Sequence, residues 1–219
     1  WTAAVEAWLP RLRDGVRATR ELGLLESGDW AWGNLAESLH SLGRWDEAAE
    51  AAGNALRVDR GARPRAVALM RLAHLALDRG DLAEASEHLT AARAASLGTH
   101  DPMPQYALPL HRIALGIAAG EGRPADARSE LLASLDGGFP PGTQRYGWPL
   151  LLAAATAEAD AHGDPATEPG RPDVLDRLRT TARPLATGAP VWEAHDAWLR
   201  AELRRAEGRA APEDWSPVV

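Results

Sequence analysis

Polar side chains recur at helical spacing along this chain and have the chemistry to bind a polar ligand. Asn34, Glu37 and His40 are three residues apart, and Arg71 and His74 repeat that interval further on. Residues three or four apart share one face of a helix, so each group would act together. Such mixed groups suit a small-molecule effector or a peptide. We expect a concave binding face lined by Asn34, Glu37, His40, Arg71, His74, Gln105, Tyr106, Arg112, Arg145 and Trp148.

The predicted binding face would carry more positive than negative groups. Arg71, His74, Arg112 and Arg145 are potential cations, whereas Glu37 is the one carboxylate in the set. Because like charges repel unless an anion neutralises them, this face would prefer ligands with an acidic group on an apolar body. The alternative is a merely solvated face that binds nothing.

The composition excludes several kinds of catalytic and cofactor chemistry. All 24 basic residues are arginine, so the chain has no phosphate-loop lysine and no Schiff-base lysine. It has no cysteine, which excludes disulfides, thiolate catalysis and cysteine zinc sites. Glu84 to His88 and Asp160 to Asp164 have the spacing of metal ligands, but a solvated helix face and an ordinary helix end explain them better. We therefore expect no enzyme, no cofactor and no metal site.

The charge and hydropathy of the chain also restrict its partners. A formal net charge of −7 argues against nucleic-acid binding, which needs clustered positive charge on one face. No apolar run approaches the roughly 18 residues of a membrane span, and no basic-then-apolar leader precedes the helices. We expect a soluble, cytoplasmic segment that contacts neither nucleic acid nor membrane and that does not bind ATP tightly.

Residues 30–58 predict a tight helical hairpin that would position the first polar group. Trp32, Leu35 and Leu39 recur at helical spacing, which indicates an amphipathic helix. Gly43 can end that helix in the left-handed conformation at little cost. A second helix follows, in which small residues such as Ala48 allow a neighbouring backbone to approach closely.

The hairpin recurs along the chain. Gly80-Asp81-Leu82-Ala83-Glu84-Ala85 repeats the turn around Gly43, and Gly122 begins a third copy. This pattern is typical of a tetratricopeptide-like repeat, which cannot bury its apolar face without neighbours. We predict an all-α, right-handed superhelical solenoid of about ten helices that forms a single domain over residues 1–219. Its buried residues should include Leu35, Leu39, Ala48, Leu72, Ala85, Ala127 and Leu131.

Prolines and glycines predict where the other helices begin and end. Pro10 should start or kink a helix that stops near Gly23, and Pro109 and Pro149 should lie inside later helices. Residues 162–170 are the expected flexible loop, and helices of about 171–187 and 190–207 should follow. The first four residues match the start of the second helix of the first hairpin, so we expect a segment of a longer protein.

Four stretches of the chain together carry a family resemblance: residues 33–48, 104–110, 148–151 and 201–209. They resemble the helical-repeat region of the large ATP-binding LuxR-type transcriptional regulators of actinobacteria. In that family a nucleotide-binding switch domain precedes the repeats and a DNA-binding helix-turn-helix follows them. The resemblance implies a non-catalytic regulatory or sensor segment that binds an effector or partner on its concave face. The alternative is a general repeat scaffold for protein–protein interaction that docks a peptide.

Overall fold

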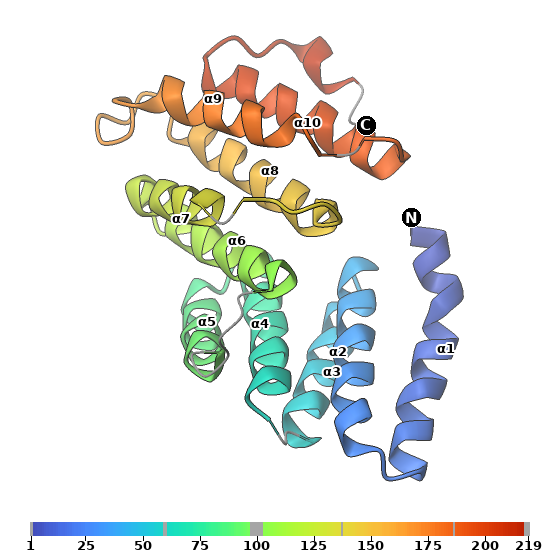
Figure 1. The fold of residues 1–219 in the computed structure, drawn as a ribbon. Helices are drawn as coiled ribbons and strands as arrows, with labels where there is room; N and C mark the ends of the chain where they lie inside the picture. The colour runs from blue at the N-terminus through green and yellow to red at the C-terminus, as the bar shows by residue number, and fades with distance from the viewer. Residues whose placement is uncertain (1, 59–60, 97–102, 137, 186, 217–219) are drawn as a thin grey trace. The chain divides into compact units, whose positions relative to one another are not determined.

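The computed structural model describes residues 2–58, 61–96, 103–136, 138–185 and 187–216. Within these ranges the chain forms ten α-helices and one 3-10 helix and contains no strand, which confirms the all-α prediction (Figure 1). The helices are α1 (Thr2–Glu21), α2 (Leu25–Ser41), α3 (Trp45–Val58), α4 (Ala62–Asp78), α5 (Leu82–Ser96), α6 (Pro104–Gly120), α7 (Pro124–Asp136), α8 (Gln144–Asp160), α9 (Arg171–Ala182), α10 (Pro190–Ala206) and η1 (Pro212–Trp215).

The chain divides into two compact units, residues 1–102 and residues 103–219. The first unit contains α1 to α5, and the second contains α6 to α10 together with η1. Each unit has an apolar core of its own. The single domain expected over residues 1–219 and the superhelical arrangement of its repeats stay predictions.

Three-residue links with a central glycine join successive helices and share one hydrogen-bond pattern. The N–H of Gly43 donates to the carbonyl of His40 at 2.9 Å, and the N–H of Arg44 donates to that of Leu39 at 2.9 Å. This pair of bonds requires a positive φ at the central residue, which glycine adopts at little cost, and Gly43 has a φ of 72°. The same pattern, with a positive φ, recurs in the three-residue links at Gly23, Gly80 and Gly122, and also at Gly208 in the longer link between α10 and η1. The predicted turn glycines are thereby confirmed.

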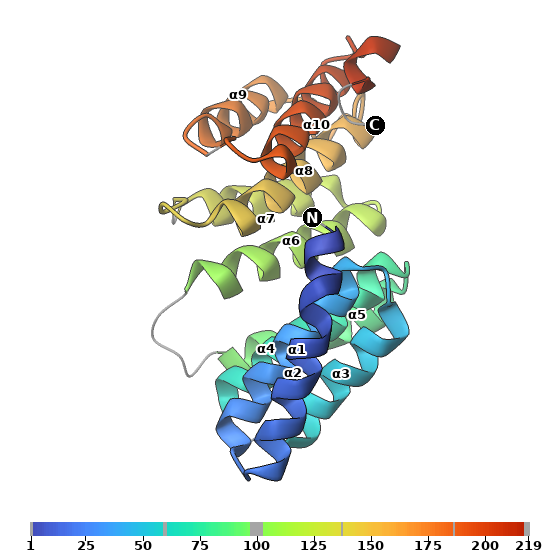
Figure 2. The same ribbon diagram turned by 90° about the vertical axis from the view of Figure 1, so that its right-hand side faces the viewer.

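Small residues let the paired helices of the first unit approach closely. In this unit α2 packs against α3, and α4 packs against α5 (Figure 2). Ala48 of α3 and Ala85 of α5 are fully buried, and Leu35 and Leu39 of α2 are buried as well. These four burial predictions are confirmed. Leu72 is only partly buried, because it packs at the edge of this unit's core.

The second unit is built around α8, which contacts α6, α7, α9 and α10. Trp148, Leu150 and Leu151 of α8 are fully buried as a result. Ala127 and Leu131 of α7 belong to the same core, as predicted. Pro149 lies inside α8 and Pro109 inside α6, so neither proline ends its helix.

Two helix boundaries differ from the prediction. The first helix runs from Thr2 to Glu21 with Pro10 inside it, so Pro10 does not start a helix, and a kink at Pro10, the other alternative, stays a prediction. Leu9 and Val16 are both buried, so the packing of the helix on either side of Pro10 offsets the lost backbone hydrogen bond. The ninth helix ends at Ala182, earlier than expected, because Pro184 has no backbone N–H to donate to the carbonyl of Thr180 and so cannot continue the helical hydrogen bonds.

Replacing Ala85 with leucine should destabilise the first unit, because the larger side chain would overpack the contact between α4 and α5. Overpacking of a filled core costs ~1–3 kcal/mol of unfolding free energy. Ala83→Leu is the matched control, since Ala83 is exposed on the same helix. Urea unfolding followed by circular dichroism should show a lower midpoint for Ala85→Leu alone. Equal midpoints would show that α5 packs through another face.

Candidate functional site

Helices α2 and α4 pack against each other in the first unit and bring four of the predicted residues together. Nη2 of Arg71 in α4 donates to Oε2 of Glu37 in α2 at 2.5 Å. One turn further along each helix, the rings of His40 and His74 meet edge to face with their centroids 4.4 Å apart. The equal spacing in the two helices thus places an ion pair beside a pair of imidazoles.

Asp78 completes this group, although it is not among the residues predicted from the sequence. Its Oδ2 atom lies 2.7 Å from Nε2 of His40 and 3.8 Å from Nε2 of His74. His74 and Asp78 are four residues apart in α4, so their common face is readable from the sequence. The approach of His40 to Asp78 cannot be predicted from the sequence, because it depends on the register between α2 and α4. Glu37, His40, Arg71, His74 and Asp78 are termed the α2/α4 polar cluster below.

The charges of the α2/α4 polar cluster largely offset one another. Glu37 and Asp78 supply two negatively charged carboxylates, and Arg71 supplies one positively charged guanidinium; the two imidazoles are left out of this comparison. The positive face expected from the sequence is therefore neutralised within the first unit. One donor is left over: Nε of Arg71 is buried and has no hydrogen-bond partner in the part of the chain that the structure describes.

The remaining predicted residues lie in varied surroundings. Asn34 is exposed on α2. In the second unit, Gln105 and Tyr106 lie in the first turn of α6 and are partly buried, as is Arg112 further along that helix. The convergence of residues from both units on one concave face stays a prediction.

Arg145 and Trp148 occupy the start of α8 but differ completely in exposure. Arg145 is exposed, and its guanidinium carbon lies 5.9 Å from the centre of the Tyr146 ring, within the range of a cation–π contact. Trp148 has no exposed surface and packs in the core of the second unit. Because neighbouring helices surround α8, its indole supports the core and leaves no face for a ligand.

A groove of about 550 Å³ lies between α9 and α10 in the second unit. Its floor is apolar, with buried Ala182, Leu199 and Leu203. Five arginines and two carboxylates line the groove around this floor. They are Arg179, Arg183, Arg200, Arg204, Arg209, Asp196 and Glu207. We term this feature the α9/α10 groove.

Carboxylates balance part of the positive charge of the α9/α10 groove. Arg200 pairs with Asp196 at 2.8 Å, and Glu207 accepts hydrogen bonds from Arg179 and Arg209. Burial raises the pKa of Glu207, but these two hydrogen bonds outweigh it and hold that pKa below its ordinary value. Glu207 therefore stays ionised at neutral pH, and the arginines still outnumber the lining carboxylates.

The sequence analysis did not identify the arginines of the groove, although their spacing contains a signal. Arg179 and Arg183 are four residues apart, as are Arg200 and Arg204, so each pair lies along one side of its helix. Only tertiary packing brings these two sides together. Arg204 also pairs with Asp214 of η1 at 3.1 Å, a contact that no local spacing predicts.

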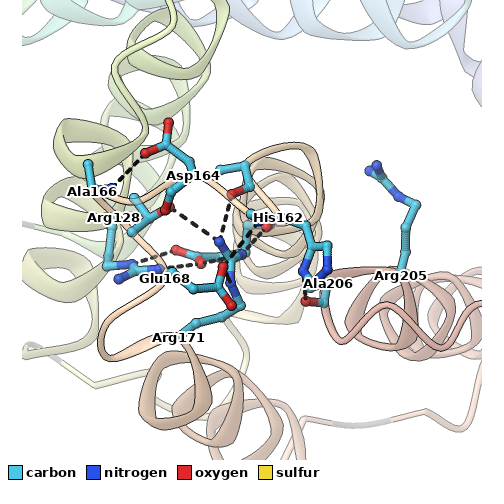
Figure 3. A network of polar contacts seen from close by, with 12 residues as sticks. Arg128, His162, Asp164, Ala166, Glu168, Arg171, Arg205 and Ala206 are labelled. Atoms are coloured by element: carbon cyan, nitrogen blue, oxygen red, sulfur yellow. Dashed lines mark hydrogen bonds and ion pairs between the residues drawn. The ribbon is translucent and has the colours of Figure 1, made fainter.

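A buried polar network joins the end of α8 to the start of α9 (Figure 3). Arg171 is buried and donates to the backbone carbonyls of Glu158 and Ala161 and to the Glu158 carboxylate. Arg128 of α7 donates to both oxygens of the same carboxylate, at 2.7 and 2.6 Å. The bonds to the carbonyls satisfy groups that the last turn of a helix leaves without partners. This network anchors residues 162–170, the expected flexible loop, through hydrogen bonds from Arg171 to Thr167 and Glu168.

Comparisons with protein-family models, with curated proteins and with solved structures find no match. None of the helices described above combines the length and the apolar character that crossing a bilayer demands. The functional interpretation therefore depends on the chain's own residues.

Arg171→Ala should strongly destabilise the second unit, because it leaves buried carbonyls and part of the Glu158 carboxylate without donors. Breaking one side of a buried ion pair costs ~3–5 kcal/mol. Arg177→Ala is the matched control on the same helix, since Arg177 pairs with Asp136 at 3.5 Å where both side chains are exposed. An exposed pair of this kind contributes about 0–1 kcal/mol. Denaturant unfolding measures both, and similar losses would show that the network is not buried in solution.

Proposed function

We propose that this chain is a non-catalytic regulatory segment, built from tetratricopeptide-like hairpins that form a right-handed superhelical solenoid. The glycine-centred link that recurs at Gly43, Gly80 and Gly122 supports the repeat, because each copy closes a pair of helices. The buried small residues of the second helices support it as well, with Ala48 and Ala85 at equivalent places. The parent protein would be a transcriptional regulator of the LuxR type, as the sequence resemblance implies.

The binding function of the segment is best supported by the α9/α10 groove. Its apolar floor and its excess of arginine suit a partner that carries carboxylates beside apolar side chains. Arginine is well adapted to this task, because its planar guanidinium can donate two parallel hydrogen bonds to one carboxylate. We therefore propose that the groove docks an acidic peptide segment of a partner protein.

A peptide is favoured over a small effector by the walls of the groove. Sites for small molecules are mostly concave pockets with aromatic and hydrophobic walls, and among the described residues no aromatic side chain lines the α9/α10 groove.

Fluorescence anisotropy with a labelled peptide of alternating glutamate and leucine tests this proposal. The double variant Arg183→Ala/Arg200→Ala should bind it at least about a hundredfold more weakly, since each of the two lost charge-assisted hydrogen bonds contributes about 1.5–3 kcal/mol. The control is Arg57→Ala/Arg63→Ala, which removes two exposed arginines of the first unit. A peptide with glutamine in place of glutamate should bind poorly to every protein. Equal binding of both peptides, or equal binding by both double variants, would contradict the proposal.

A further inference from the structure

The two imidazoles and the Asp78 carboxylate of the α2/α4 polar cluster have the arrangement of a metal-binding site. One potential ligand atom from each of His40, His74 and Asp78 lies within 4.8 Å of the other two. His74 and Asp78 share one face of α4, and His40 reaches them from the last turn of α2. The three groups therefore come from two separate helices of one packed unit.

The distances within this group fit a small divalent ion. Zinc binds imidazole nitrogens and carboxylate oxygens at about 2.0–2.2 Å, so two ligands in a tetrahedral arrangement lie about 3.3–3.5 Å apart. The two distances from Asp78 Oδ2 to the histidine Nε2 atoms, 2.7 and 3.8 Å, lie on either side of that value. Small side-chain rotations would therefore bring the three atoms to equal separations around an ion.

The burial of the group suits an ion that keeps contact with solvent. The side chains of His40 and His74 are each 13% exposed, and that of Asp78 is 29% exposed. The two imidazoles are thus held in place by packing, whereas the carboxylate side stays open for entry of an ion and for a water ligand. A site with three protein ligands and one open position is a known arrangement for zinc.

The charges around the group are compatible with a bound cation. Two arginines lie close to the group in sequence, and a carboxylate offsets the charge of each: Arg71, one turn before His74, pairs with Glu37, and Arg79, next to Asp78, pairs with Asp46 at 2.6 Å. Two neutral imidazoles can donate electron pairs to a metal, and the Asp78 carboxylate balances part of its charge. Imidazole ligands favour zinc and other late transition metals over magnesium or calcium, which prefer oxygen ligands.

We propose that His40, His74 and Asp78 bind one divalent transition-metal ion of the zinc type, with water completing its coordination. The ion would link α2 to α4 and thereby stabilise the packing of the first unit against unfolding. The potential ligands within single stretches of the sequence predicted no metal site. This site depends on a contact between helices from neighbouring hairpins.

Calorimetric titration of the whole chain with zinc chloride, after removal of metal by a chelator, tests the site directly. We expect one ion per chain and a higher melting temperature with zinc. His74→Gln and Asp78→Asn should each weaken binding at least tenfold and reduce the thermal shift. His88→Gln is the matched control, because His88 lies 3.5 Å from Glu84 within α5 alone, and this variant should bind as the unaltered chain does.

Cobalt substitution gives a second readout, which reports the coordination geometry of the bound ion. Visible absorption of cobalt bound in a tetrahedral site should appear with the unaltered chain and with His88→Gln, and should be lost with His74→Gln. Circular dichroism shows whether each variant keeps its helices. The proposal is overturned if folded His74→Gln and Asp78→Asn bind zinc as well as the unaltered chain, or if the chain binds no zinc at millimolar concentration.

Discussion

The backbone conformation of the link glycines is the constraint on which the helix packing depends. A glycine with positive φ lets the N–H groups after a helix return to its last carbonyls, so the chain reverses within three residues. At Gly80 this closes α4 and starts α5 almost at once, and the two helices have no freedom to separate. The short link also fixes their register, which brings the fully buried Ala85 against the facing helix. A longer link would leave both the spacing and the register undetermined.

The elements that depend on local chemistry were predictable from the sequence. Gly43 and its equivalents were identified from the repeated turn, and the burial of Leu35 and Leu39 followed from helical spacing. The length of α1 was not predictable in this way. Pro10 interrupts the local hydrogen bonding, but contacts made by Leu9 and Val16 in the core outweigh that cost.

The candidate sites were only half predictable, because they depend on contacts between helices. Four members of the α2/α4 polar cluster were identified from their spacing, yet Asp78 enters it only because α2 and α4 pack in one register. Trp148 was predicted to lie on the binding face, but it is fully buried because other helices surround α8. The arginines of the α9/α10 groove meet across two helices, and no spacing along one helix specifies that meeting.

The link glycine determines how each hairpin closes, and substitution of Gly80 tests this most directly. A Cβ atom added at Gly80 would have no atom within 4 Å beyond its neighbours in the chain, and one added at Gly15 inside α1 would have none beyond its neighbours and the backbone of that helix. Of these two glycines, Gly80 alone has a positive φ, so Gly80→Ala should lower the free energy of unfolding by roughly 1–2 kcal/mol. Gly15→Ala should raise it by about 0.5–1 kcal/mol, because alanine is favoured inside a helix. If both substitutions stabilise the chain in urea unfolding, the left-handed turn is absent in solution and the account is wrong.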